Sequence, residues 1–263
     1  MTIVGMDLGS RSVKIVTFVD DQITHKKIID TAIFYREYCT NINGKIDIDL
    51  QRLGLGEMDK IVSTGYGKNN VDVINSKKLT ELKAHVLGAM YQTKFYDFTL
   101  IDIGGQDSKV ISVRNAKMMD MILNDKCAAS CGRYLENMAR VLGMEVSDMA
   151  KYSDFPVTLS STCAVFAESE LIGRISEGNK LENLAAGVNY SLFKRIKPLI
   201  NKFASDTIIV TGGVAQNGAL IKFIEDEINV KKVIVPKYPQ LNAAIGCLVY
   251  ASGQNSLFDV YHR

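Results

Sequence analysis

VGMDLGSRSVKIV at residues 4–16 and LIDIGGQDSKVIS at residues 100–112 share one pattern. In each stretch an apolar run ends near an acidic residue, Asp7 or Asp102, and a glycine-rich turn and a second apolar run follow. A weak internal repeat of this kind is typical of a duplicated chain. It predicts an α/β protein made of two similar halves, each of which opens with a β-hairpin.

The expected halves follow from the point where this pattern restarts. We place the first half at residues 1–95, rejoined by a C-terminal helix at 241–263, and the second half at 96–240. Apolar residues at three- and four-residue spacing predict helices at residues 79–93, 127–142, 163–176, 182–203 and 241–251, with another helix from about residue 216. Apolar runs predict strands at residues 2–7, 12–19, 22–36, 59–63, 97–103, 108–114, 117–123, 207–211 and 232–235.

The composition is that of a globular protein with an ordinary core. Of 263 residues 47% are hydrophobic, and 31 Lys and Arg against 29 Asp and Glu leave a net charge of +2. This balance argues against a dedicated nucleic-acid-binding protein. The sequence has no apolar run of the ~20 residues that cross a bilayer, and its first residues lack the pattern of a signal peptide. We therefore expect a cytoplasmic protein with neither nucleic acid nor a membrane as its partner.

Three glycine-rich turns each follow a predicted strand. They contain Asp7-Leu8-Gly9-Ser10, Asp102-Ile103-Gly104-Gly105-Gln106-Asp107 and Thr211-Gly212-Gly213-Val214. Because glycine has no Cβ, it lets backbone N–H groups approach a ligand, and strings of such donors bind phosphate. A carboxylate beside them holds Mg²⁺ directly or through water. The three turns in this order therefore predict a site for a nucleotide phosphate.

The five cysteines are expected to be free thiols in a cytoplasmic protein. Cys127 and Cys163 each open a predicted helix, where free N–H groups and the helix dipole favour a thiolate. Two thiolates are half of a four-cysteine site, so two chains related by a two-fold axis would complete a [4Fe–4S] cluster. Cys131 lies four residues after Cys127 and is expected on the same side of that helix. Cys39 and Cys247 lie among apolar residues and are expected to pack in the core.

These motifs resemble the ATPase superfamily of actin, Hsp70 and the sugar kinases. Residues 5–10 are similar to its first phosphate motif, residues 101–107 to its second, and residues 210–215 to its adenosine motif. Over nearly its whole length, the chain further resembles the activator component of 2-hydroxyacyl-CoA dehydratases. The stretches that carry this resemblance are Thr64-Gly65-Tyr66-Gly67, Ile101 to Asp107, Asn124-Asp125-Lys126-Cys127-Ala128-Ala129, Ser161-Thr162-Cys163, Phe166-Ala167-Glu168-Ser169-Glu170 and Gly212-Gly213-Val214-Ala215.

The resemblance implies two RNase H-like halves with a nucleotide cleft between them. It implies an ATPase that passes a low-potential electron to a partner iron–sulfur enzyme, in the first instance a 2-hydroxyacyl-CoA dehydratase. It also implies an anaerobic homodimer with one [4Fe–4S] cluster bridging the subunits, and ferredoxin or flavodoxin as the electron donor. The same family includes the ATPase subunits of aryl-CoA reductases and the reductases of double-cubane cluster proteins, which remain alternatives.

The resemblance also implies roles for individual residues around ATP, ADP and Mg²⁺. Asp7 and Asp102 would hold Mg²⁺ or its waters. Gln106 or Asp107 would orient the attacking water, which completes the expected catalytic set. The expected nucleotide contacts are Gly9, Ser10, Arg11, Ser12, Gly104, Gly105, Gly212, Gly213, Val214 and Asn217.

The cysteine segments separate this interpretation from others. By resemblance, Cys127 and Cys163 would be the cluster ligands. Cys131 stands where the common family pattern has another residue, and it would be a spare thiol or an alternative ligand. A small-molecule kinase of the same fold would instead need an acceptor-binding base and no cluster. A scaffold similar to actin or to a chaperone ATPase would form filaments or bind clients and be indifferent to oxygen.

Overall fold

Two units make up the chain. They are unit 1, Met1–Tyr96 with Gln240–Arg263, and unit 2, Asp97–Pro239. The computed structural model describes residues 1–20, 22–65, 72–73, 75–124, 127–161, 163–203 and 205–253. Some residues of the predicted motifs and of the expected last helix lie outside the described residues, namely Tyr66, Gly67, Asp125, Lys126, Thr162 and residues 254–263.

Unit 1 is built on a five-stranded sheet in the order β3-β2-β1-β6-β8. β1 pairs antiparallel with β2 and parallel with β6. The strands of this sheet are β1 (Thr2–Leu8), β2 (Ser12–Val19), β3 (Gln22–Asp30), β6 (Lys60–Thr64) and β8 (Ser76–Lys78). A second small sheet contains β4 (Cys39–Ile42), β5 (Lys45–Ile48) and β7 (Asp72–Val73). The helices are α1 (Thr31–Tyr38), α2 (Glu81–Thr93) and α8 (Asn242–Ser252).

Unit 2 has its own five-stranded sheet, in the order β11-β10-β9-β12-β13. Its strands are β9 (Phe98–Ile103), β10 (Ser108–Arg114), β11 (Lys117–Asn124), β12 (Thr207–Thr211) and β13 (Lys232–Ile234). Its α-helices are α3 (Gly132–Leu142), α4 (Val146–Met149), α5 (Ala164–Ser176), α6 (Leu181–Lys202) and α7 (Gly218–Glu227). In the described part of the chain, short 3-10 helices lie at η2 (Ala128–Ser130), η3 (Gly213–Gln216) and, at the boundary of the two units, η4 (Pro239–Leu241).

The two sheets have the same topology. The strands β1, β2, β3, β6 and β8 of unit 1 correspond in sheet position to β9, β10, β11, β12 and β13 of unit 2. In both sheets the first three strands pair antiparallel and the last two join in parallel. The hairpins β1–β2 and β9–β10 are the repeated stretches seen in the sequence. The expected duplication of α/β halves is therefore confirmed.

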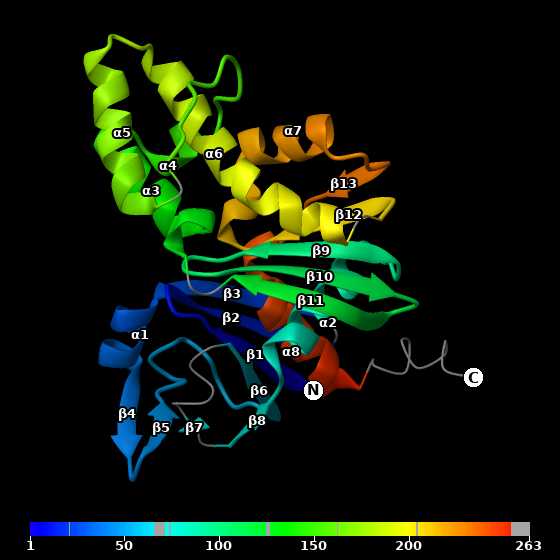
Figure 1. Cartoon of the computed structure of the whole chain (residues 1–263). Coiled ribbons are helices and arrows are strands. Elements are labelled where there is room, and N and C mark those ends of the chain that lie inside the picture. Colours follow the sequence, from blue (N-terminus) through cyan, green and yellow to red (C-terminus); the bar gives the residue numbers. More distant parts are fainter. Residues whose placement is uncertain are drawn as a thin grey trace. The chain divides into compact units, whose positions relative to one another are not determined.

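Helices cover unit 2 unevenly (Figure 1). α3, α4 and α5 gather at one end of the long helix α6, while α7 lies beside its other part, next to β12 and β13. Tyr134 of α3 and Phe193 of α6 are fully buried in the shared core. No helix of the described ranges has both the length and the apolar composition needed to cross a bilayer.

The last helix, α8, packs in unit 1 although it follows the last strand of unit 2. A Cβ added at Gly246 would lie only 1.8 Å from the carbonyl oxygen of Ala84, so α8 and α2 touch backbone to backbone. On its other side, the buried thiol of Cys247 lies 3.8 Å from the carbonyl oxygen of Met6 on β1. Small residues on α8 thus let it fit tightly between α2 and the sheet.

A helix replaces the end of the strand predicted at residues 22–36. β3 ends at Asp30, and the carboxylate of Asp30 accepts hydrogen bonds from the N–H groups of Ala32 and Ile33. This is an N-cap, which stabilises the first turn of a helix. The chain therefore changes from strand to helix at Thr31, inside a stretch whose apolar content alone favoured a longer strand.

The helix predicted at residues 127–142 is wrong in its first turn. Cys127 and Cys131 both have extended backbones, with φ of −130° and −141°, and the short 3-10 helix η2 lies between them. α3 itself begins at Gly132. The two cysteines therefore share no helix face, and Cys127 is exposed whereas Cys131 is buried. The prediction for Cys163 is confirmed, because α5 begins directly after it.

Candidate nucleotide and thiol sites

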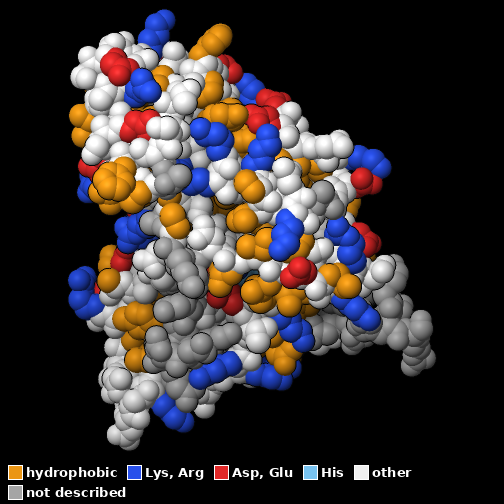
Figure 2. Space-filling view, in the orientation of Figure 1, with side chains coloured by type: hydrophobic (Ala, Val, Ile, Leu, Met, Phe, Trp, Pro, Cys, Tyr) orange, Lys and Arg blue, Asp and Glu red, His pale blue; other side chains and the backbone are white. Residues whose placement is uncertain are grey.

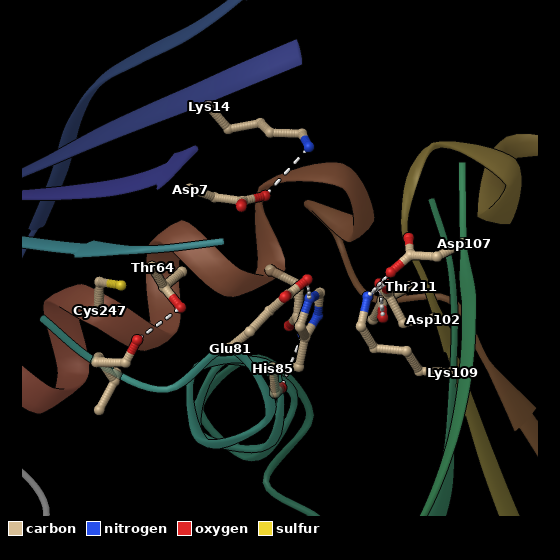
Figure 3. Close-up of polar contacts among 12 residues, drawn as sticks. Asp7, Lys14, Thr64, Glu81, His85, Asp102, Asp107, Lys109, Thr211 and Cys247 are labelled. Carbon is tan, nitrogen blue, oxygen red and sulfur yellow. Dashed lines mark hydrogen bonds and ion pairs between the residues drawn. The ribbon is translucent and has the colours of Figure 1, made fainter. Parts of the chain in front are cut away.

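In unit 1 the first predicted acid lies among charged and polar neighbours on adjacent strands. Asp7 is opposite Lys14 on β2 and beside Thr64 on β6 in the strand register. The Lys14 ammonium is 3.1 Å from an Asp7 carboxylate oxygen (Figure 3). The Thr64 hydroxyl donates to the carbonyl of Leu79, 3.0 Å away. Gly65 follows with φ +99°, and a Cβ there would lie 2.7 Å from an Asp7 carboxylate oxygen.

Unit 2 repeats this arrangement residue for residue. Asp102 is opposite Lys109 on β10 and beside Thr211 on β12. The Thr211 hydroxyl donates to a carboxylate oxygen of Asp102 over 2.8 Å. Gly212 then follows with φ +87°, and a Cβ there would be 2.2 Å from the carbonyl oxygen of Ile103.

Lys109 joins two carboxylates in unit 2. Its ammonium lies 2.5 Å from Asp107 and 3.9 Å from Asp102 (Figure 3). Lys109 and Asp102 are both almost completely buried, at 4% and 3% exposure. Burial of a charged side chain is tolerated when an opposite charge pairs with it. Lys109, Asp102 and Asp107 therefore form a charged cluster beside the turn at Gly104 and Gly105.

Thr64 and Thr211 were already part of the glycine-rich motifs in the sequence, but the paired lysines were not among the predicted site residues. Lys14 follows Asp7, and Lys109 follows Asp102, at the same spacing in both repeats, so the signal was present in the repeat itself. Carboxylates suit Mg²⁺, and a lysine beside them supplies a point charge for phosphate. Each unit therefore brings together the chemical groups that bind a metal–phosphate complex.

The first glycine turn is held by the start of α1. The hydroxyl of Thr31 donates to the carbonyl of Gly9 over 2.7 Å, and its backbone N–H donates to the carbonyl of Arg11 over 3.3 Å. The guanidinium of Arg11 pairs with Asp30. Ser10 is exposed. Arg11 thus braces the turn, while the exposed Ser10 is accessible to a ligand.

The second glycine turn is closed by a hydrogen bond from the Gly104 N–H to the Asp107 carbonyl, 2.9 Å long. Gln106 stands exposed in this turn. The carbonyls of Gly104 and Gly105 accept hydrogen bonds from the start of α3, as described below. The turn is therefore fixed on its inner side, with Gln106 on its open side.

The third glycine turn leads into η3 and α7. The buried side chain of Asn217 accepts a hydrogen bond from the Leu220 N–H and donates one to Asn189, each over 2.9 Å. Asn217 therefore caps α7, and Val214 is also buried. Beside this turn lies a hollow of about 380 Å³, lined by Ser147, Ala150, Lys151, Ser153, Gln216, Gly218, Ala219 and Lys222.

The two cysteines predicted as ligands are the exposed ones. Cys127 and Cys163 are exposed, Cys39 is half-buried, and Cys131 and Cys247 are buried. The N–H groups of Val165 and Phe166 at the start of α5 lower the pKa of Cys163. Burial raises the pKa of Cys131 and raises that of Cys39 to about 12. Exposure therefore favours Cys127 and Cys163 as metal ligands, and the lowered pKa of Cys163 adds to this for that residue.

Within the described residues of one chain, no three His, Cys, Asp or Glu side chains are grouped closely enough to hold a metal ion between them. Two accessible thiols per chain fit instead a four-cysteine centre shared by two chains. The donor set thus suits an iron–sulfur cluster, provided that a second copy supplies the other half.

The segment before Cys163 is held by Glu170 of α5. The Glu170 carboxylate accepts hydrogen bonds of 2.8–3.0 Å from the N–H groups of Ser160 and Ser161 and from the Ser160 hydroxyl. Burial by itself would raise the pKa of Glu170, but these hydrogen bonds outweigh it and lower the pKa from 4.5 to about 2. In the sequence, Glu170 stands out only as part of the family motif Phe166-Ala167-Glu168-Ser169-Glu170.

Replacing Glu170 by glutamine is expected to make the chain less stable in a pH-dependent way. Because the folded state lowers the pKa of Glu170, its contribution is complete above pH 4.5 and is lost as the pH falls toward 2. We expect a loss of about 1 kcal/mol at neutral pH, since solvent screens much of a strong hydrogen-bonded charge. Urea unfolding at several pH values measures it, with Glu168→Gln on the same helix as the control. An equal loss at pH 7 and at pH 2 would contradict this account.

Comparisons with known proteins identify the family of the chain. The profile of the BadF/BadG/BcrA/BcrD ATPase family matches residues 4–251. The 2-hydroxyisocaproyl-CoA dehydratase activator of Clostridioides difficile is 39% identical over 210 residues, which are 76% of this chain and 77% of that protein. The (R)-2-hydroxyglutaryl-CoA dehydratase activating ATPase of Acidaminococcus fermentans is 35% identical over 252 residues, 94% of this chain and 95% of that protein.

A solved structure leads to the same conclusion about the fold. The activator of the 2-hydroxyisocaproyl-CoA dehydratase from Clostridium difficile, solved with bound ADPNP, has a TM-score of 0.84 and 32% identity. It covers 98% of this chain, and the match includes 96% of that chain. The expected fold, two duplicated halves of the actin-like ATPase type, is confirmed by this match.

Proposed function

Because the chain belongs to the BadF/BadG/BcrA/BcrD ATPase family, we propose that it couples ATP hydrolysis to electron transfer into a partner iron–sulfur enzyme. The two relatives that are named as dehydratase activators or activating ATPases support a 2-hydroxyacyl-CoA dehydratase as that partner. Ferredoxin or flavodoxin is the proposed electron donor. The protein acts as a homodimer.

The duplicated turns bind Mg²⁺ and the nucleotide phosphates. Asp7 and Asp102 hold Mg²⁺ or its waters, and Lys14 and Lys109 neutralise charge on the phosphate oxygens. Their pairing with carboxylates, at 3.1 Å for Lys14 and 3.9 Å for Lys109 to Asp102, supports this role. Phosphoryl transfer to water depends chiefly on such positioning and charge stabilisation, so no covalent nucleophile is needed.

The second turn also orients the attacking water. Gln106 is exposed there, whereas Asp107 is engaged by Lys109. We therefore propose that Gln106 orients the attacking water and that Asp107 holds Lys109 in place. The third turn lies on the adenosine side, where Gly212 and Gly213 contact the nucleotide and Asn217 fixes the start of α7.

Cys127 and Cys163 hold a [4Fe–4S] cluster together with their counterparts in a second chain. The cluster supplies one-electron chemistry when it is bound. The observation that carries this part of the proposal is the exposure of these two thiols in a chain that buries Cys131 and Cys247. An exposed thiol with a lowered pKa, as at Cys163, is available to a metal as a thiolate.

The surface next to Cys163 supports contact with another protein. Val165 and Phe166, the second and third residues after Cys163, are 70% and 69% exposed. Ile172 and Ile175 are also exposed along α5. Hydrophobic side chains reach the surface in this upper region of Figure 2, interspersed with charged ones. Exposed apolar patches of this kind mark interaction surfaces. This patch contributes to the contact between subunits and to docking of the partner enzyme.

The coupling of nucleotide to electron transfer is tested by redox titration of the cluster-loaded protein under anaerobic conditions. The midpoint potential is expected to differ between the Mg·ADP state and the state with a non-hydrolysable ATP analogue by at least about 59 mV, a tenfold shift of a one-electron equilibrium. The spectrum of the cluster follows the titration. Identical potentials in both nucleotide states would contradict an ATP-driven electron carrier.

A further inference from the structure

The second phosphate turn is bonded directly to the segment that carries Cys127. The backbone N–H of Gly132 donates to the Gly104 carbonyl, and that of Arg133 donates to the Gly105 carbonyl, each over 2.9 Å. Gly132 and Arg133 are the first two residues of α3. Two consecutive backbone hydrogen bonds fix both the distance and the direction of the helix start relative to the turn.

Gly132 favours this close contact because it has no side chain. A Cβ at this position would lie 3.2 Å from the Gly104 carbonyl oxygen and 3.4 Å from the Gly105 Cα. It would also lie 3.5 Å from a methyl group of Val214 in the third glycine turn. Two of the three nucleotide turns therefore meet at the first residue of α3, and a methyl group there would force the second turn to shift.

The connection continues from Gly132 to Cys127 through a tightly bonded segment. Cys131 and Ser130 are buried. The Ser130 hydroxyl donates a hydrogen bond of 3.4 Å to the Cys127 carbonyl and accepts one from the Asn124 side chain. A shift of the turn is thus passed to Cys127 through packed and hydrogen-bonded neighbours.

The segment before Cys163 is fixed by other elements. The described hydrogen bonds of Ser160 and Ser161 go to Glu170 on α5 and to Arg195 on α6, whose guanidinium donates to the Ser161 carbonyl over 2.6 Å. These partners belong to α5 and α6. Arg195 in turn stacks on the ring of Tyr134 in α3, 4.8 Å away, so the phosphate turn reaches this segment only indirectly. The two exposed cysteines therefore differ in their connection to the nucleotide site.

We propose that Gly132 is a positioning residue that couples the second phosphate turn to Cys127, so that bound nucleotide changes the environment of Cys127 and leaves that of Cys163 nearly unchanged. Bound nucleotide then acts on the cluster through only one of the two ligands that each chain supplies, namely Cys127. This inference rests on the proposed function in one respect, namely that Mg·ADP binds at the turn of Gly104 and Gly105.

The test uses the full-length chain without a cluster, so its readout does not depend on activity. Iodoacetamide alkylates the exposed thiols, and peptide mass spectrometry follows Cys127 and Cys163 separately, with and without saturating Mg·ADP. We expect Mg·ADP to slow alkylation of Cys127 at least about fivefold, the lower end of measured site-to-site couplings, and to change Cys163 less than about twofold. In Gly132→Ala the effect on Cys127 is expected to disappear while ADP still binds.

The matched control is Gly173→Ala, a helical glycine of α5 with open space around it. This variant is expected to behave as the unmodified chain. Should Gly132→Ala not fold, hydrogen exchange of the Gly132 and Arg133 amides in the unmodified chain decides the question. Slower exchange with Mg·ADP supports the coupling, and unchanged exchange overturns it.

Equilibrium dialysis with ADP separates this inference from the proposed function. Absence of ADP binding would overturn the nucleotide part of the proposed function. Three results would overturn the coupling alone while ADP still binds. They are equal protection of both cysteines, protection of neither cysteine, and full protection of Cys127 in Gly132→Ala.

Discussion

Replacing Cys163 by serine is expected to abolish iron binding by the anaerobically reconstituted protein. Serine has nearly the same size, but its hydroxyl does not supply the thiolate that an iron–sulfur cluster needs. Because each chain provides two of four ligands, loss of Cys163 removes two ligands from a symmetric dimer. The same result is expected for Cys127→Ser. Iron and acid-labile sulfide per chain are the measured quantities.

Two other cysteines serve as controls for this experiment. Cys131→Ser removes a buried thiol, and Cys39→Ser removes a half-buried one whose pKa is raised to about 12 by burial. Both variants are expected to keep their iron. Full iron content in Cys163→Ser, or its loss in Cys131→Ser, would show that the ligands are assigned to the wrong residues.

Replacing Asp102 by asparagine is expected to slow ATP hydrolysis by at least about 100-fold, the usual effect of removing one strong electrostatic contact from a transition state. The amide oxygen still accepts the hydrogen bond of Thr211, and Lys109 keeps its partner Asp107, so the fold is expected to survive. What is lost is the negative charge that we propose holds Mg²⁺.

Steady-state phosphate release measures this effect, and thermal unfolding of the same variant checks its fold. Asp120→Asn, which changes an exposed carboxylate on the edge strand β11, is the matched control and is expected to hydrolyse ATP at the normal rate. The duplication predicts a comparable loss for Asp7→Asn. Normal hydrolysis by Asp102→Asn would remove Asp102 from the catalytic set.

The fold could be predicted from the sequence to the extent that the repeat is visible in it. The acids and glycines of both hairpins pointed to duplicated halves, and the sheets have the same strand order. Lys14 and Lys109 stand at the same position in the two repeats, but a lysine seven residues after an acid does not by itself indicate a pair. The strand register shows the pairing, because it puts each lysine opposite its acid.

The first turn of the helix predicted at residues 127–142 shows where a sequence pattern fails. The apolar residues that suggested the helix lie in α3 proper, from Tyr134 onward. The start of α3 is set instead by hydrogen bonds from Gly132 and Arg133 to a turn distant in the sequence. Periodicity carries no information about such long-range contacts, so neither the burial of Cys131 nor its separation from Cys127 could be foreseen.

The most direct test of the account is iron per chain together with the mass of the assembly, measured on anaerobically purified and reconstituted protein. We expect a dimer with about two irons and two sulfides per chain, since one [4Fe–4S] cluster is shared by two chains. Protein that stays free of iron after reconstitution, or a monomer with about four irons per chain, would contradict a cluster held between two copies by Cys127 and Cys163.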